Sequence, residues 1–93
     1  MRVANLVSAI LKNADLKNAD LSSADLRGAH LQYTHLENAH LEGADLRGAN
    51  LVGTHLEGAT LMGVDLEGAI MPDGKKYDPA IHTIKQFTAP TPK

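Results

Sequence analysis

The sequence has no cysteine and no tryptophan, and its only aromatic residues are one phenylalanine and two tyrosines among 93 residues. Without cysteine, a disulfide framework, a thiolate zinc site and a cysteine nucleophile are all excluded. Without many aromatic side chains, the core must be built from leucine, alanine, valine and isoleucine. A domain of this size gains enough stability from such a core only when the packing is very regular.

Two further absences concern partners and location. The formal net charge is −2, whereas nucleic-acid binders carry a basic patch or stripe, so we expect no direct nucleic-acid partner. No stretch approaches about 18 uninterrupted apolar residues, so we expect no membrane span. The N-terminal MRVANLVSAIL is interrupted by polar residues and is not followed by a small-residue cleavage site, so it is not predicted to be a signal peptide. These features predict a soluble, cytoplasmic protein.

What the sequence does contain is an unbroken five-residue repeat. The unit is A-(D/N/H)-L-x-(G/N/S), with a small residue two positions before each leucine. We predict that the leucines and the small residues all belong to the core. The leucines of the series, which Met71 continues, are Leu6, Leu11, Leu16, Leu21, Leu26, Leu31, Leu36, Leu41, Leu46, Leu51, Leu56, Leu61 and Leu66.

A period of five fits neither a regular helix nor a regular strand. On an α-helix, successive leucines would step about 140° around the axis and form no stripe. On a strand, an odd spacing would send successive leucines to opposite faces. The chain must therefore turn once in each repeat. A type II turn needs positive φ at the last residue of the repeat, which is Gly, Asn or Ser everywhere except at Tyr33.

A chain that turns the same way every five residues, with its apolar side chains always inward, is a β-solenoid. The period alone leaves open whether three or four sides make one coil. The A-(D/N)-L-x-x pattern over residues 4–71 resembles the pentapeptide-repeat family. That resemblance implies an all-β fold, a right-handed quadrilateral β-helix with four repeats, or twenty residues, in each coil. At that size the chain is expected to make about 3.5 coils.

The repeat ends at Met71, so we predict a β-helix over residues 1–71 and a separate C-terminal segment over residues 72–93. This segment begins with the turn-forming sequence Pro-Asp-Gly. An Asp-Pro helix start and helically spaced apolar residues then predict a short helix at about 79–87, which would cap the solenoid before a disordered tail. No equivalent cap precedes the first repeat. Its end is expected to be exposed, covered by a partner, joined end to end in a homodimer, or continued in a longer chain.

With twenty residues per coil, the outward residues form four columns, and His30, His35 and His40 point to three different sides. They cannot share a metal ion. The weak metal candidates are instead Asp15, His35 and His55, which stack in one column where two imidazoles and a carboxylate would converge. Hydrogen bonding along this column explains the same residues without a metal, and we expect no cofactor.

The second column is the least charged side of the predicted rod. Grouped apolar residues on an exposed face mark a contact surface, although the C-terminal segment folding back over them is an alternative. The residues predicted to form this partner surface are Ile10, His30, Gln32, Tyr33, Asn50 and Val52.

No column places a nucleophile beside a base in a pocket, so we predict a non-catalytic scaffold that binds a protein partner. The family resemblance implies an alternative, because some members protect DNA gyrase from quinolone-type drugs by mimicking DNA. Residues 4–71 hold nine acidic and four basic residues, a net of 9 − 4 = 5 negative charges. Duplex DNA of the same length, roughly 17 Å, carries about ten, which weighs against mimicry. Metal binding through the histidine column is a second alternative.

Overall fold

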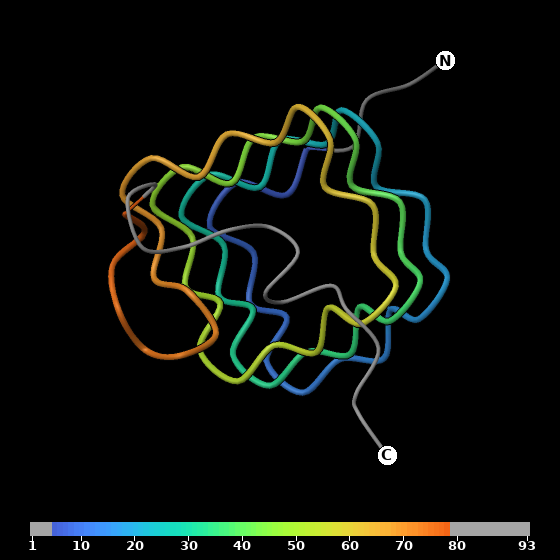
Figure 1. Cartoon of the computed structure of the whole chain (residues 1–93), viewed down its shortest axis with the longest axis horizontal. Coiled ribbons are helices and arrows are strands. Elements are labelled where there is room, and N and C mark those ends of the chain that lie inside the picture. Colours follow the sequence, from blue (N-terminus) through green and yellow to red (C-terminus); the bar gives the residue numbers. More distant parts are fainter. Residues whose placement is uncertain (1–4, 79–93) are drawn as a thin grey trace.

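The computed structural model describes residues 5–78, whose backbone winds as a stack of four-sided coils (Figure 1). Parallel bridges join residues that are twenty apart, beginning with Asn5 and Asp25 and ending with Asn50 and Ile70. Within residues 5–78 there is no helix, and each side of the coil contributes a single bridge rather than a longer strand. The quadrilateral coil of twenty residues predicted from the resemblance is therefore confirmed.

We number the four sides by the outward residue of the first coil. Face 1 begins at Asn5, face 2 at Ile10, face 3 at Asp15 and face 4 at Asp20. Each face continues with the residues twenty and forty positions later, and faces 1 and 2 extend to Asp65 and Ile70. Each outward residue lies between an alanine-type and a leucine position, whose side chains point inward. No helix that could cross a membrane is found among the described residues.

Backbone hydrogen bonds join neighbouring coils in both directions. The N–H of Leu26 donates to the carbonyl of Asp45 in the next coil at 2.8 Å, and the N–H of His30 donates to Ala9 in the preceding coil at 2.8 Å. This pattern recurs on each face, because every repeat presents the same backbone groups at the same height. Each coil is thus held by its neighbours, and a single coil would leave these groups unpaired.

The corners have the turn geometry that the sequence predicts. The last residue of each repeat from Ser8 to Gly68 has positive φ, between 58° and 75°, and this includes Tyr33 at 60°. A hydrogen bond from the alanine of the next repeat to the preceding leucine closes each turn, as from Ala29 to Leu26 at 3.0 Å. Glycine adopts this conformation without strain, whereas the other residues bear a small cost.

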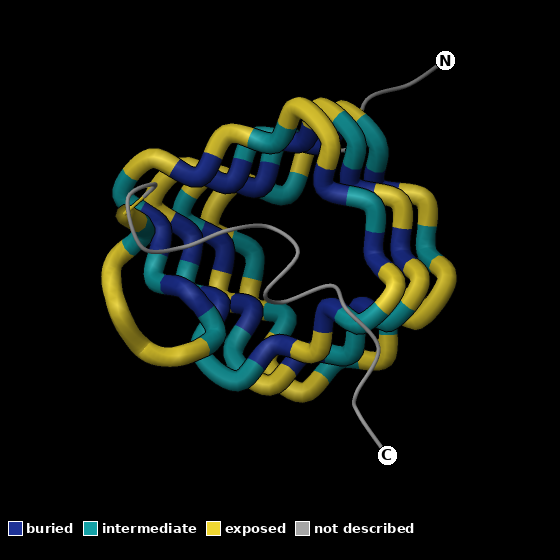
Figure 2. The backbone as a smooth tube through the Cα atoms, viewed as in Figure 1, coloured by how far each residue is buried: buried dark blue, intermediate teal, exposed yellow. Residues whose placement is uncertain are grey.

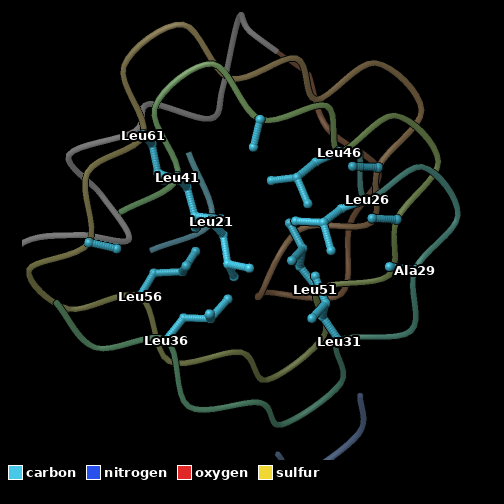
Figure 3. Close-up of a cluster of buried hydrophobic side chains, with 14 of the residues drawn as sticks. Leu21, Leu26, Ala29, Leu31, Leu36, Leu41, Leu46, Leu51, Leu56 and Leu61 are labelled. Carbon is cyan, nitrogen blue, oxygen red and sulfur yellow. The ribbon is translucent and has the colours of Figure 1, made fainter. Parts of the chain in front are cut away.

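The core is a column of inward leucines and alanines (Figures 2 and 3). Leucines from all four sides converge inside the coil, and those twenty residues apart, such as Leu21, Leu41 and Leu61, lie one above another. In Figure 2 the buried positions lie on the inner side of each face, whereas the corners are exposed. The predicted core is confirmed from Leu21 to Met71 except at Val64, which is partly buried, as are Leu6, Leu11 and Leu16 of the first coil.

Two threonines occupy alanine positions in the core and satisfy their hydroxyl groups there. Thr34 donates from Oγ1 to the carbonyl of Leu11 at 2.7 Å, and Thr54 donates in the same way to Leu31 at 2.6 Å. Both side chains are buried. Because a buried hydroxyl without a partner is costly, these bonds explain how the core accommodates threonine at these two positions.

After Met71 the chain reverses and returns along face 2. Lys76 forms an antiparallel bridge with Ile70, and Tyr77 donates from its backbone N–H to Ala69 at 2.7 Å. Gly74, with φ of 84°, makes the turn. Figure 1 shows this loop beside the last coil, in orange. Residues 76 and 77 extend face 2 along the rod axis and do not cover its outer surface. The rest of the predicted C-terminal segment, with the helix at 79–87, lies outside the described residues.

Candidate functional site

Face 1 carries a ladder of alternating carboxylates and guanidinium groups. Arg27 binds Asp25 through Nε and Nη2 at 2.8 and 2.7 Å, and Arg47 binds Asp45 in the same bidentate way at 2.9 and 2.6 Å. Between coils the contacts are longer, 3.9 Å from Arg27 Nε to Asp45 and 3.8 Å from Arg47 Nε to Asp65. The arginines therefore neutralise two of the three aspartates in this column.

The arginines also explain the acidity of this face. Hydrogen bonding from Arg47 lowers the pKa of Asp45 to about 2, and Arg27 lowers the pKa of Asp25 in the same way. In return, the hydrogen bond that Arg47 donates to Asp45 raises the pKa of Arg47. Paired charges of this kind favour the ionised forms, so each Asp–Arg pair stays charged at physiological pH while its two charges cancel.

The outward aspartates and asparagines have a structural role within their own repeat. Their Oδ1 accepts a hydrogen bond from the backbone N–H two residues later, an Asx turn that supports the corner. On face 4, for example, Asp20 accepts from the Ser22 N–H and hydroxyl at 3.1 and 2.8 Å, and the hydroxyl bond lowers the pKa of Asp20. The full set of outward residues in the coil with this bond is Asn5, Asp15, Asp20, Asp25, Asp45, Asn50 and Asp65.

Face 3 brings two histidines and a glutamate together. The rings of His35 and His55 stack with centroids 4.6 Å apart and an interplanar angle of 5°. Glu37 lies beside them, with its Oε2 3.3 Å from His35 Nδ1, and the ligand atoms of all three residues lie within 4.8 Å of one another. Both histidine side chains are nearly half exposed, at 43% and 46%.

Of the three predicted metal candidates, the two histidines come together on this face and Asp15 does not join them. His35 and His55 meet, as the twenty-residue spacing predicts. Asp15 is bridged to His35 through the backbone, but its Oδ1 accepts from the Lys17 N–H at 3.2 Å, and it does not belong to the three-residue group. Glu37 was not predicted. The spacing of two residues in His-x-Glu was the available signal, because it places both side chains on the same outward side.

His30 and His40, which precede and follow His35 by five residues, lie on two other faces. His30 belongs to face 2, where the stacked residues are Ile10 and Asn50, and His40 belongs to face 4, where they are Asp20 and Thr60. His40 Nδ1 lies 3.6 Å from Glu42. Each of these histidines therefore lacks a second imidazole in its column, in contrast to His35.

Face 2 holds the predicted partner surface. Ile10 and Tyr33 are among the most exposed large apolar side chains, at 77% and 55%. The Tyr33 ring lies over Gly53, where an added Cβ would collide with it. Asn50 supports its own corner through the Val52 N–H, and the Oε1 of Gln32 is buried without a hydrogen-bond partner among the described residues.

A hollow of about 360 Å³ lies at the C-terminal end of the described coils. Its lining includes two carboxylates and one phenol but no histidine, lysine or serine, so it does not pair a nucleophile with a base. The lining residues are Val64, Asp65, Leu66, Glu67, Gly68 and Tyr77.

Comparison with known proteins agrees with the geometry of the coil. The family of pentapeptide repeats matches residues 4–43 and 39–73, with eight copies of its repeat. None of the curated proteins matches this chain significantly.

Several solved structures of pentapeptide repeat proteins are similar to this chain. A pentapeptide repeat protein of the cyanobacterium Cyanothece 51142 is 42% identical, with a TM-score of 0.62 over 80% of this chain and 54% of its own. A pentapeptide repeat protein of the Arabidopsis thaliana thylakoid lumen is 27% identical, with a TM-score of 0.57 over 75% of this chain and 52% of its own. HetL of Nostoc, a pentapeptide repeat protein involved in heterocyst differentiation regulation, is 29% identical over 80% of this chain and 52% of its own, with a TM-score of 0.25.

This chain thus spans about half the length of these solved relatives. Proteins of this kind form a right-handed quadrilateral β-helix, in agreement with bridges that recur every twenty residues here. The repeat, the four-sided coil and the family match together establish that the chain belongs to the pentapeptide-repeat family.

Proposed function

We propose that this chain is a non-catalytic interaction module, a rigid rod that binds a protein partner through face 2. The observation that carries the proposal is the exposure of Ile10 and Tyr33 on the least charged side of the coil. On this side Lys12 is the only charged residue from Ile10 to Val52, whereas face 1 presents an acidic and a basic residue in the second and third coils and two acidic residues in the fourth. Exposed apolar groups on an uncharged surface lose little on desolvation and favour protein contacts.

The rod supports such a role because its coils hold one another rigidly. Each face is fixed by backbone bonds to the coils above and below, so side chains on face 2 keep their positions without a partner. A pre-organised surface of this kind binds with little loss of conformational entropy. A pocket with paired catalytic groups is not needed for this role, and the hollow at the C-terminal end does not provide one.

The experiment compares partner capture by the full chain and by a face 2 variant. Ile10→Asp and Tyr33→Ser suit this test because aspartate and serine already occupy the same repeat positions at Asp15 and Ser23. We expect the double variant to fold and to lose the captured protein. The matched control is Met62→Glu, which alters the exposed apolar side chain of face 4 at a position where other repeats have glutamate. Equal capture by the double variant and the wild type would refute the proposal.

The charge distribution gives less support to the DNA-mimic alternative. Two of the five repeat aspartates form bidentate pairs with Arg27 and Arg47, so face 1 does not offer a continuous row of free negative charges. A DNA-like surface needs about one unpaired charge per 1.7 Å of length. We expect no inhibition in a gyrase supercoiling assay and no protection of gyrase from a quinolone; either effect at low micromolar protein would restore mimicry as the leading function.

We also propose an end-to-end homodimer through the first coil. The half-buried Leu6, Leu11 and Leu16 leave an apolar edge there, and no described coil lies on that side of residues 5–24. A two-fold axis through face 3, perpendicular to the rod, would pair face 3 with itself and face 2 with face 4. Asp15 would then face Lys17 of the other copy, and Lys12 would face Asp20, so each charge at the edge meets its opposite.

Charge reversal tests this arrangement. We expect a concentration-dependent dimer in sedimentation equilibrium, weakened in a Lys12→Glu, Lys17→Glu variant because like charges would then meet. An Asp15→Lys, Asp20→Lys variant should also dissociate, and mixing the two variants should restore dimers as heterodimers. A monomeric wild type, or a dimer that neither variant weakens, would refute this contact.

A further inference from the structure

Face 3 holds a set of side chains that neither the interaction surface nor the family accounts for. Within the described residues, the three groups whose metal-binding atoms come together are His35, Glu37 and His55. They lie on a different face from Ile10 and Tyr33, so the inference does not depend on the proposed partner surface.

The fold places these side chains by simple geometry. His35 and Glu37 are two residues apart and therefore project from the same side of the chain. His55 follows His35 by twenty residues, and the two are joined by a parallel bridge that sets them in adjacent coils, about 4.8 Å apart. Two ligands from one coil and one from the next thus surround a single point on the outer surface.

The chemistry of the set is that of a transition-metal site. Two imidazoles and one carboxylate form the ligand set that zinc uses in several catalytic sites, with the fourth position left open. Imidazole nitrogen also suits nickel and copper, whereas calcium and magnesium prefer sets made of oxygen alone. From these residues we propose that face 3 binds one divalent transition-metal ion, with zinc as the reference ion, through His35, Glu37 and His55.

The distances show what binding would change. Around a tetrahedral ion with bonds of about 2.1 Å, the ligand atoms lie about 3.4 Å apart. His35 Nδ1 and Glu37 Oε2 are already 3.3 Å apart, whereas the stacked imidazole planes keep the in-plane lone pairs of His35 and His55 parallel. One ring must rotate out of the stack, which their exposure to solvent permits. Metal binding and ring stacking are therefore mutually exclusive.

Two neighbouring carboxylate atoms support the arrangement. The Oε1 of Glu37 is buried and has no hydrogen-bond partner among residues 5–78, as is also true of Glu42 on face 4, so Glu37 is held against the face while its Oε2 lies beside His35. Glu57 lies 3.9 Å from His55 Nδ1 and can orient that ring through the nitrogen that does not bind the metal.

Calorimetric titration of the full chain, with any affinity tag removed, tests the site with zinc chloride and nickel chloride as probes. We expect saturable binding of one ion per chain, weakened roughly tenfold or more by His35→Asn, His55→Asn or Glu37→Gln. Asparagine occupies the same repeat position at Asn5 and Asn50, so the histidine variants should keep the fold. The matched controls are His40→Asn, which removes a histidine beside Glu42 on face 4, and Asp15→Asn, which tests the ligand first predicted for this column.

A second readout separates metal binding from a structural effect. The ring proton resonances of His35 and His55 should shift on addition of zinc as the stack opens, whereas those of His30 and His40 should not. Absence of saturable binding would overturn the proposal, and so would equal affinity in the wild type and the His35 and His55 variants. Loss of binding in Asp15→Asn but not in Glu37→Gln would overturn the ligand set.

Discussion

The two ends of the solenoid are built from the same repeat but differ in burial. In the first coil Leu6, Leu11 and Leu16 are only partly buried, whereas in the last coil Leu66 and Met71 are buried. The difference at the C-terminal end comes partly from the returning segment, whose Tyr77 packs against the core and donates its backbone N–H to Ala69. A repeat therefore supplies an apolar face, but only a neighbouring layer buries it.

The largest expected effect is on the free energy of unfolding, and it should differ between a leucine in the middle of the solenoid and one at its N-terminal end. Leu36 is 1% exposed, and its replacement by alanine should lower the free energy of unfolding by about 2 to 5 kcal/mol, because a cavity forms in a closed core. Leu16 has the same place on face 3 but in the first coil. Leu16→Ala should lower the free energy of unfolding clearly less, because the Leu16 side chain is already partly exposed to water. Urea denaturation of both variants measures the difference, and equal losses would contradict the comparison.

At the C-terminal end, Gly74→Ala tests the covering segment. Gly74 has φ of 84°, and an added Cβ would meet nothing within 4 Å, so the cost of about 1 to 2 kcal/mol arises from the backbone alone. Hydrogen exchange should quicken at the amides of Met71 and Tyr77, whose bonds to Lys75 and Ala69 depend on this turn.

The control for that experiment lies at the other end of the same molecule. Amides of the first coil, such as Leu11, whose N–H donates to His30, should keep their exchange rates in the Gly74→Ala variant. If both ends quickened together, the solenoid would open as one unit and the ends would not be independent.

A smaller loss of stability is expected when the Thr34 hydroxyl, which forms a hydrogen bond between the second coil and the first, is removed. Thr34→Val keeps the volume of the side chain but removes the hydrogen bond to the Leu11 carbonyl, which should cost about 0.5 to 1.5 kcal/mol. Thr54→Val removes the equivalent bond to Leu31 one coil further along. Exchange at first-coil amides should rise more in the Thr34 variant, and the opposite order would show that this bond does not hold the N-terminal end.

The smallest effect concerns the charges of face 1, which begin only in the second coil because Asn5 stands at the first position. The pKa of Asp45 is about 2 when folded, below the ordinary value of 3.8, so its contribution to stability is present above pH 3.8. It is lost as the pH falls from 3.8 through about 2. A carbon NMR titration of the Asp45 carboxyl should give a midpoint near 2, moving towards 3.8 in Arg47→Gln. An unchanged midpoint in that variant would exclude Arg47 as the cause.

Much of the fold was predictable because the five-residue period constrains it strongly. The inward leucines, the positive φ at each corner and the twenty-residue stacking all followed from the repeat and the family resemblance. Even Tyr33, the only bulky corner residue, keeps the same backbone conformation as its neighbours. The capping helix expected at 79–87 lies outside the described residues, and the cytoplasmic location stays a prediction.

The candidate metal site was predictable only in part. The twenty-residue spacing identified His35 and His55 as neighbours, but it favoured Asp15 as the third member. The structure places Glu37 there instead, because the Asp15 carboxylate accepts the Lys17 N–H of its own corner. The twenty-residue spacing predicts where each Cα lies. The direction of a short acidic side chain depends instead on the backbone N–H groups within its reach.

The sequence alone determined which residues face inward and where the chain turns, because a strict period leaves one consistent arrangement of apolar groups. The family resemblance added which side chains share a column, because the period does not fix the number of sides in a coil. The tertiary structure decided what the period does not encode: the partners of each polar side chain, the half-buried leucines of the first coil and the return of residues 72–77 along face 2. These features depend on contacts between coils and at the ends, where the repeat has no neighbour and local sequence does not specify what covers it.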